Sequence, residues 1–322
     1  MSIEIGKSYK YGIKEIKTID VVFNTDFNNV LLTNELCGGD PVYGQVKYLY
    51  DENWNIICKE YDILFSKNNY IGITLKGGMG NIMFQIAILY SLSKKYNLIP
   101  IIEHIDSTCY IHTNKEYEFT KIFKRNINNI QYNQHYYEKD GEFSTYINII
   151  AKQGKNILLD GYFQNEKYFK EYKNDLIYLF NIKYTGNKYN GEKKCFIHIR
   201  RGDYININLH NVNLIEYYKK SIEYIKNIHN DCIFYIFSDD INWCKNNDLF
   251  NSINCYFIDD LNDVETMGLM ILCEYGGICA NSTFSWWGVY LNENENKKMI
   301  FPKIWFNCNW NIDIYPENSV VI

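Results

Sequence analysis

From residue 194 onward, short apolar runs alternate with longer amphipathic segments. The apolar runs are typical of buried strands and lie at 195–199, 233–238, 255–258, 277–280 and 299–301. The amphipathic segments predict helices at about 214–229, 241–247, 263–275 and 284–292. This alternation predicts a mostly parallel sheet with helices on both faces, joined by right-handed crossovers.

A similar unit begins at residue 70. A strand at 71–75 is followed by the turn Gly77-Gly78-Met79-Gly80-Asn81, a helix at 82–95 and a strand at 98–103, which is a βαβ pattern. We expect Asn81 to be the N-cap of the helix, and the glycines to let backbone amides approach an anion. Further along, a strand ends within 158–164 and a helix is expected at about 166–180. Residues 106–144 are weakly patterned and predict loops with short helices.

The glycine-rich turn is also similar to a dinucleotide-binding fingerprint. Glu103 ends the second strand about where an acid that binds a ribose would lie. Counted from Gly78, however, the third glycine position of the fingerprint is Met83, whose side chain would disturb the close packing of helix and strand. Nicotinamide or flavin binding is therefore the weaker interpretation.

Residues 1–68 have a different pattern, with short β-like runs separated by Asn, Asp and Gly. Residues 46–50 and 54–58 flank a turn and predict a hairpin. We interpret this part as a small β-rich appendage, for which an assembly module, a targeting module and a structural cap are alternatives. With a linker at about 184–194, we expect three units, 1–68, 69–190 and 191–322.

Composition narrows the classes of function. The chain has 322 residues, 47% of them apolar, and a formal net charge of -5. It therefore has ample material for packed cores and lacks the basic balance of a general nucleic-acid-binding protein. Its longest uncharged stretch, 77–93, is too short and polar for a membrane span, and its first ten residues lack the apolar core of a signal peptide. We expect a cytoplasmic protein without a transmembrane segment, with reduced cysteines; association with a membrane surface is left open.

Polar side chains follow three strands of the predicted C-terminal sheet. They are His198, Arg200 and Arg201 after the first strand, Ser238, Asp239 and Asp240 after the second, and Asn281, Ser282, Thr283 and Ser285 after a later one. Ligands of open parallel sheets bind beyond the carboxyl ends of the strands, so we expect these clusters to converge on one crevice. The alternative is that the Ser and Asp residues only cap helices and that Arg201 only pairs with Asp203 in a surface turn.

The clusters favour a nucleoside diphosphate as ligand. Arginine offers a permanent charge and a planar fork of donors for phosphate oxygens, and a carboxylate suits the donor edge of guanine. Asp239 and Asp240 are adjacent and do not form a spaced Asp-x-Asp pair. Since the arginines would neutralise a diphosphate, we expect chemistry without a metal ion or another cofactor. Trp286 and Trp287 follow at helical spacing, which favours packing over sugar stacking.

Five motifs occur in order along about residues 70–310. They are Gly77-Gly78-Met79-Gly80-Asn81, Gly161-Tyr162-Phe163-Gln164, His198-Ile199-Arg200-Arg201-Gly202-Asp203-Tyr204, Phe237-Ser238-Asp239-Asp240 and Ala280-Asn281-Ser282-Thr283-Phe284-Ser285-Trp286-Trp287-Gly288. In these motifs the chain resembles the α-1,2-fucosyltransferases of glycosyltransferase family 11. The resemblance implies an α/β, GT-B-like pair of facing Rossmann-type domains, with GDP-fucose held mainly by the C-terminal one. It also implies transfer of L-fucose, with inversion at its anomeric carbon, to the 2-hydroxyl of a β-galactoside.

The resemblance assigns roles to individual residues. Arg200 and Arg201 are expected to hold the β-phosphate and stabilise the departing GDP. His198, with Asp239 or Asp240, is expected to contact the nucleoside. The other candidates for donor binding are Gly78, Gly80, Asn81, Ser238, Ser282, Thr283 and Ser285. Asp160 is the candidate for a catalytic base, if the reaction uses one.

Two alternatives stay open at this point. One is a transferase that uses another sugar nucleotide, such as GDP-mannose or a UDP-sugar, or another acceptor on the same scaffold. The other is a non-catalytic glycan-binding protein, against which the arginine pair argues because a lectin needs no diphosphate clamp. The sequence does not indicate the natural acceptor or the oligomeric state.

Overall fold

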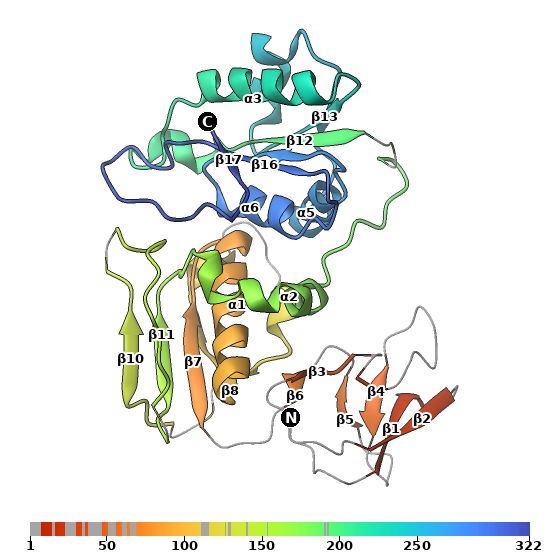
Figure 1. Ribbon diagram of the computed structural model, residues 1–322, viewed down its shortest axis with the longest axis vertical. Helices are drawn as coiled ribbons and strands as arrows, with labels where there is room; N and C mark the ends of the chain where they lie inside the picture. Colours follow the sequence, from red (N-terminus) through yellow and green to blue (C-terminus); the bar gives the residue numbers. More distant parts are fainter. Residues whose placement is uncertain are drawn as a thin grey trace.

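The computed structural model describes residues 8–14, 17–22, 30–33, 36–37, 47–50, 56–59, 63–64, 69–110, 116–125, 127, 130–139, 141–152, 154–189, 191 and 193–322. A six-stranded and a five-stranded parallel sheet, each with its helices, form the two main halves of the molecule (Figure 1). A small antiparallel sheet from the N-terminal residues lies at the opposite end from the six-stranded half (Figure 1). The predicted α/β, GT-B-like pair of Rossmann-like units with a β-rich appendage is confirmed.

The C-terminal half contains six parallel strands. In spatial order they are β14 (Cys255–Ile258), β13 (Ile233–Ser238), β12 (Lys194–Ile199), β15 (Gly276–Ile278), β16 (Lys298–Phe301) and β17 (Val320–Val321). The helices of this half are α3 (Ile215–Ile228), α4 (Ile241–Lys245), α5 (Asp263–Ile271) and α6 (Thr283–Tyr290), with short 3-10 helices η5 (Asp203–Asn206) and η6 (Asp248–Phe250). The strands and helices predicted from residue 194 onward are confirmed to within a few residues.

Strand β12 separates two apolar cores. Alternate residues of a strand point to opposite faces, and Cys195, Ile197 and Ile199 pack in the core that contains α3. Phe196 points the other way, into the core that contains α5, α6 and the five-stranded half. His198 follows Phe196 by two residues and therefore shares the face that is turned toward the other half of the molecule.

The other main half, which we call the middle half because it lies between the N-terminal part and the C-terminal half in the sequence, contains five parallel strands. In spatial order they are β10 (Gln134–Tyr137), β11 (Ile157–Asp160), β7 (Tyr70–Leu75), β8 (Ile99–Ile105) and β9 (Lys124–Arg125). Helix α1 (Met79–Tyr96) joins β7 to β8, and 3-10 helices η1 (Ser107–Tyr110) and η2 (Glu118–Thr120) follow β8. Residues 106–144 were expected to lack strands, but they supply both edge strands of this sheet. These strands are short, and β10 alternates between exposed and half-buried residues, so it has no apolar run.

Two local expectations in this half are wrong. Helix α1 begins at Met79 with Gly78 as its N-cap, so Asn81 is not the cap and lies inside the first turn. Its side chain instead accepts a hydrogen bond from Thr283. The segment 166–180 is not one helix. Two 3-10 turns, η3 (Glu166–Tyr168) and η4 (Lys170–Tyr172), precede α2 (Lys173–Phe180), because Phe169 between them has φ of -143°, outside the helical range.

The N-terminal part forms two small antiparallel sheets. The strands are β1 (Ser8–Ile13), β2 (Lys17–Val22), β4 (Tyr48–Tyr50) and β5 (Ile56–Lys59) in one sheet, and β3 (Val30–Leu31) and β6 (Ile63–Leu64) in the other. The predicted hairpin is confirmed by the antiparallel pairing of β4 with β5, and its turn, 51–55, lies outside the described residues. Among the described residues, no helix has the length and apolar character needed to cross a membrane.

A buried aromatic cluster joins the two main halves. Phe84 of α1 lies 4.5 Å from Trp286 and 4.9 Å from Trp287 of α6, measured between ring centroids. Phe169 stacks on Trp287 at 5.3 Å, and both tryptophans are fully buried. The indole of Trp287 also donates a hydrogen bond of 3.0 Å to the Gly80 carbonyl. The expectation that Trp286 and Trp287 serve packing is confirmed, and the two halves share one apolar core.

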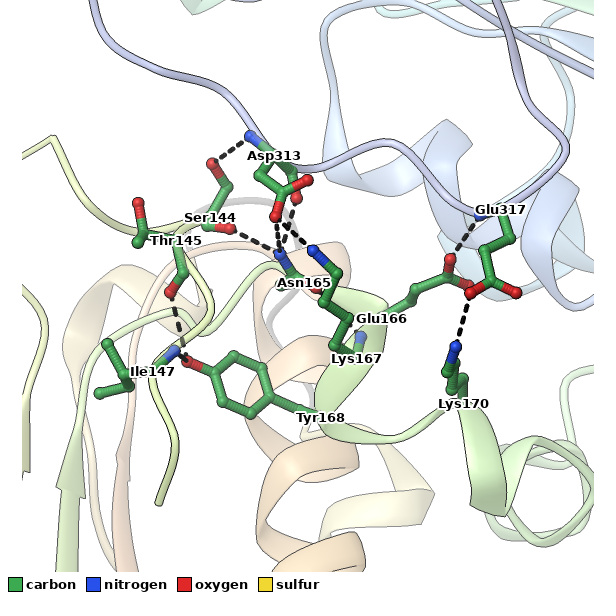
Figure 2. A network of polar contacts seen from close by, with 10 residues as sticks. All are labelled: Ser144, Thr145, Ile147, Asn165, Glu166, Lys167, Tyr168, Lys170, Asp313 and Glu317. Carbon is green, nitrogen blue, oxygen red and sulfur yellow. Dashed lines mark hydrogen bonds and ion pairs between the residues drawn. The ribbon is translucent and has the colours of Figure 1, made fainter.

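A long segment between β16 and β17, residues 302–319, crosses from the C-terminal half to the middle half; we call it the strap. Figure 2 shows its polar contacts: Asn165 donates to the backbone carbonyl of Asp313 at 2.8 Å, and Lys167 pairs with the Asp313 carboxylate at 2.8 Å. The backbone amide of Glu317 donates to Glu166, and Lys170 pairs with the Glu317 carboxylate at 2.5 Å. The strap thus ties the halves together on the polar side of their junction.

Candidate active site

A cavity of about 990 Å³ lies between the two parallel sheets, at the carboxyl ends of their strands. Each of the three polar clusters contributes to its wall. The contributing members are His198, Arg200, Ser238, Asp239, Asn281, Ser282 and Thr283. The middle half faces them with the turn that opens α1, which includes Gly78, Gly80 and Asn81. The predicted convergence of the clusters on one crevice is therefore seen in the structure.

Arg200 lies on the cavity wall among fixed partners. Its guanidinium pairs with Asp203 at 2.6 Å and with Asp239 at 3.0 Å, and it lies 5.1 Å from the centre of the Tyr204 ring. Only 17% of its side chain is exposed. Two carboxylates and an aromatic face thus hold one permanent cation in place, which limits the rearrangement needed when an anion arrives.

Arg201 points elsewhere. Its Nε donates to Asp240 at 3.0 Å, its guanidinium lies 4.2 Å from the Trp243 ring, and it is not part of the cavity wall. Its backbone amide donates to Asp239 at 2.8 Å. The two neighbouring arginines therefore differ: Arg200 meets the cavity, whereas Arg201 joins the end of β12 to the start of α4. The Asp203 contact considered for Arg201 is made by Arg200.

Ser238, Asp239 and Asp240 divide into cavity and capping residues. Asp239 lines the cavity and braces both the Arg200 side chain and the Arg201 backbone. Asp240 is the N-cap of α4, where it accepts from the amide of Trp243, and it is absent from the wall. Ser238 accepts from the amide of Asp240 at 2.9 Å. Within this cluster, the alternative that the residue only caps a helix therefore applies to Asp240.

His198 carries a buried ring nitrogen without a partner. Its side chain is 6% exposed and lines the cavity, and its Nδ1 has no hydrogen-bond partner, as is also true of Nδ1 of His210 on the cavity wall. Burial, with a smaller contribution from the Arg200 charge, lowers the pKa of His198 to about 3. The ring is therefore neutral at physiological pH, and a buried polar atom without a partner favours a ligand that supplies one.

The cluster after β15 surrounds the start of α6. Ser282 is the N-cap, accepting from the amide of Phe284 at 3.3 Å, and it also lines the cavity. Ser285 is fully buried, bonds to the Ser282 carbonyl and does not reach the cavity. Asn281 donates to the carbonyls of His210 and Trp305, so it fixes two loops at the rim.

Asn81 links the walls of the cavity. Its Oδ1 accepts from Thr283 at 2.9 Å and from Gln164 at 3.0 Å. The close approach of α1 to α6 explains the glycine at position 80, because a Cβ there would come within 2.5 Å of the Thr283 backbone. Asn81 therefore brings a polar side chain of the middle half into contact with the start of α6 on the C-terminal wall.

A carboxyl group that sequence reasoning missed lies on the wall of the middle half. Glu138 follows β10 and accepts from the backbone amides of Tyr162 and, at 2.7 Å, Phe163. Burial raises the pKa of Glu138 to about 8, although these two hydrogen bonds act in the opposite direction. Phe163 is held at φ of +52°, so the carboxyl group also braces an uncommon backbone conformation. Recognition of β10 as a strand would have placed Glu138 at a carboxyl end.

Asp160, the candidate base from the sequence, does not line the cavity. Its carboxylate pairs with Lys76 at 2.9 Å. Glu103, weighed as a ribose-binding acid, is also absent from the wall and accepts from Tyr132. Within the described parts of the chain, no group of three or more His, Cys, Asp or Glu side chains is arranged to hold a metal ion.

Several known proteins are similar to this chain. The family model described as glycosyl transferase family 11 matches residues 44–315. An α-1,2-colitosyltransferase of Escherichia coli is 32% identical over 267 residues, covering 72% of this chain and 91% of that protein. A galactoside 2-α-L-fucosyltransferase of Caenorhabditis elegans is 27% identical over 166 residues, covering 45% of this chain and 46% of that protein. The crystal structure of fucosyltransferase NodZ from Bradyrhizobium superimposes with a TM-score of 0.44 at 11% identity, covering 69% of this chain and 93% of that one.

Proposed function

Because the chain belongs to glycosyltransferase family 11, we propose that it transfers L-fucose from GDP-fucose to the 2-hydroxyl of a β-galactoside, with inversion. The observation that carries the proposal is the position of Arg200, a braced cation that lines the same cavity as Ser282, the N-cap of α6. A fixed guanidinium and a helix start in one cavity suit a diphosphate better than they suit a neutral glycan.

The proposal assigns the donor to residues 191–322 and the acceptor to residues 69–190. Arg200 and Ser282 bind the β-phosphate, with Thr283 and Asn81 at the sugar side. His198 offers Nδ1 to the nucleoside, and Asp239 accepts from the donor edge of guanine. The carboxyl-end location of all these groups agrees with the general rule for ligands of open parallel sheets.

In the proposed reaction, the bond between the fucose anomeric carbon and the β-phosphate oxygen breaks, and GDP leaves with the electron pair. Arg200 stabilises the charge that develops on the leaving phosphate. The acceptor hydroxyl forms the new bond from the opposite face and passes its proton to Glu138. We give this role to Glu138 in place of Asp160, because Glu138 lines the cavity while Asp160 is engaged by Lys76.

GDP-colitose is a second candidate donor. The similarity to an α-1,2-colitosyltransferase favours GDP-colitose as an alternative, since colitose is fucose without its 3-hydroxyl group. The two donors share the diphosphate and the guanine, so the groups named above serve either of them. Side-by-side kinetics with GDP-fucose, GDP-colitose, GDP-mannose and a UDP-sugar decide between them.

The experiment that tests the proposal is GDP release from GDP-fucose by the purified protein, with and without lactose, in the presence of a chelator. We expect lactose to accelerate release, the chelator to have no effect, and the product to carry an α-1,2 linkage. Binding of GDP without any acceptor-dependent release would contradict the galactoside assignment. Absence of GDP binding would contradict the donor site itself and favour the glycan-binding alternative.

A further inference from the structure

An aromatic group at one end of the cavity has no part in the donor site described above. It combines Phe143 of the middle half with Phe306 and Trp310 of the strap, and all three line the cavity. Measured between ring centroids, Phe143 lies 4.9 Å from Phe306 and 5.7 Å from Trp310, and Phe306 lies 5.5 Å from Trp310. All three pairs are edge to face. We call these three residues the platform.

Trp310 is the exposed member of the platform. Its side chain is 38% exposed, whereas Phe306 is 8% and the neighbouring Trp305 is 3% exposed. Gly141 makes room for it, because a Cβ at position 141 would lie 2.9 Å from the indole Nε1, and Gly141 has φ of +82°. A large apolar surface left open inside a cavity favours a ligand with an apolar face of its own.

The platform is held rigidly from both halves of the protein. On the strap, three residues beyond Trp310, Asp313 is bonded to Asn165, Lys167 and Ser144 (Figure 2). In the middle half, the Phe143 carbonyl accepts from the backbone amide of Gln164 at 2.7 Å. Anchoring of this kind fixes the ring positions before a ligand binds, which lowers the entropic cost of stacking.

The order of strands separates the platform from Asp239, the proposed partner of guanine, which follows β13 on the β14 side of β12. Asp259 and Leu261 line the cavity just beyond β14, which is one edge of the six-stranded sheet. The strap leaves from β16, on the other side of β12 and its Arg200. The platform therefore lies past the phosphate position, at the end away from β14. Glu138 precedes Phe143 by five residues on the same segment, so the proposed base and the platform share one wall.

We propose that the platform is the subsite for the acceptor sugar, in which Trp310 stacks on the apolar C–H face of a hexopyranoside. Stacking of this kind recognises the ring while leaving its hydroxyl groups to the polar wall that carries Glu138. The inference rests on the proposed transferase function and names Trp310 as the residue that holds the acceptor.

The test uses W310A, W310F and the control Y256A, whose tyrosine on β14 is 54% exposed and does not line the cavity. Kinetics with GDP-fucose and lactose give kcat/KM for the acceptor, and titration with GDP gives affinity at the donor site. Saturation-transfer NMR with methyl β-galactoside and GDP measures acceptor binding without turnover. Thermal melting shows that each variant is folded.

We expect W310A to lower acceptor kcat/KM by about tenfold or more, the change typical of losing a ring-stacking contact, with GDP affinity unchanged. W310F should keep most of the activity, and Y256A all of it. Unchanged acceptor kinetics in W310A would overturn the inference, and so would a loss confined to GDP affinity, which would place guanine on Trp310. If the wild type binds the galactoside without transferring fucose to it and W310A does not bind it, the transferase function is contradicted and the platform is still supported as a sugar-binding subsite.

Discussion

The two walls of the cavity are built for different chemistry. On the C-terminal wall, Arg200 is a permanent cation that Asp203 and Asp239 brace from two sides. On the facing wall, Glu138 is a titratable carboxyl group that backbone amides hold in a largely buried place. One wall thus offers a charge that does not vary with pH, and the other a proton acceptor that does. The difference matches a diphosphate leaving group on one side and an attacking hydroxyl on the other.

The largest effect should follow from removing the fixed charge. We expect R200A to lower kcat by about 10²–10³-fold, the cost of losing one preorganised group that stabilises developing negative charge. The variant should stay folded, because Arg200 lines an open cavity and its partners Asp203 and Asp239 are already 48% and 25% exposed, so water can solvate both carboxylates. Steady-state kinetics and a melting curve measure both quantities. Wild-type turnover in R200A would show that Arg200 does not stabilise the leaving phosphate.

The next effect concerns the titratable wall. If Glu138 accepts the acceptor proton, only its ionised form is active, so the rate should rise with pH up to about 8 and level off above it. The E138Q variant should lose roughly 10²-fold in kcat, at the lower end of the contribution of a general base. Tyr162 and Phe163 donate to different oxygens of Glu138, and Gln keeps only one of these acceptors, so some loss of activity is expected from structure alone. A purely structural role would reduce activity without flattening the pH profile. A pH limb that persists unchanged in E138Q would exclude the proposed role.

The two walls also differ in how far the sequence predicts them. Arg200 and Asp239 follow six-residue strands that are mostly apolar, and Ser282 follows the short but wholly buried strand β15, so the pattern locates each carboxyl end. Glu138 follows an edge strand of four residues that has no apolar run, so periodicity gives no signal for it. Contacts between distant segments, such as that of Asn81 with Thr283, depend on how the halves pack and leave no local pattern. Where each unit begins and ends, set at residues 68 and 190, stays a prediction.

A smaller effect should come from His198, whose contribution, unlike that of Glu138, should not depend on pH near neutrality. Because burial holds the pKa of His198 near 3, the ring is neutral throughout the range above about pH 4, and its contribution to GDP binding should not vary with pH there. H198A should weaken GDP binding by about tenfold, equivalent to the loss of one hydrogen bond to a buried partner. Calorimetric titration with GDP at pH 6 and pH 8 measures both. A His198-dependent change in affinity between these pH values would contradict the neutral, donor-side assignment.

The smallest effect should separate the two neighbouring arginines. Arg201 faces Asp240 and Trp243 and not the cavity, so R201A should change kcat/KM by less than about threefold while lowering stability by about 1 kcal/mol, the value of a half-exposed ion pair with some stacking. R201K, which keeps the charge but loses the planar stack, should lie between the wild type and R201A in melting temperature. Kinetics of R200A and R201A, measured side by side, show whether a phosphate meets one guanidinium or two. A loss in R201A as large as that in R200A would mean that Arg201 turns into the cavity when the donor binds, and the fixed wall would then include both.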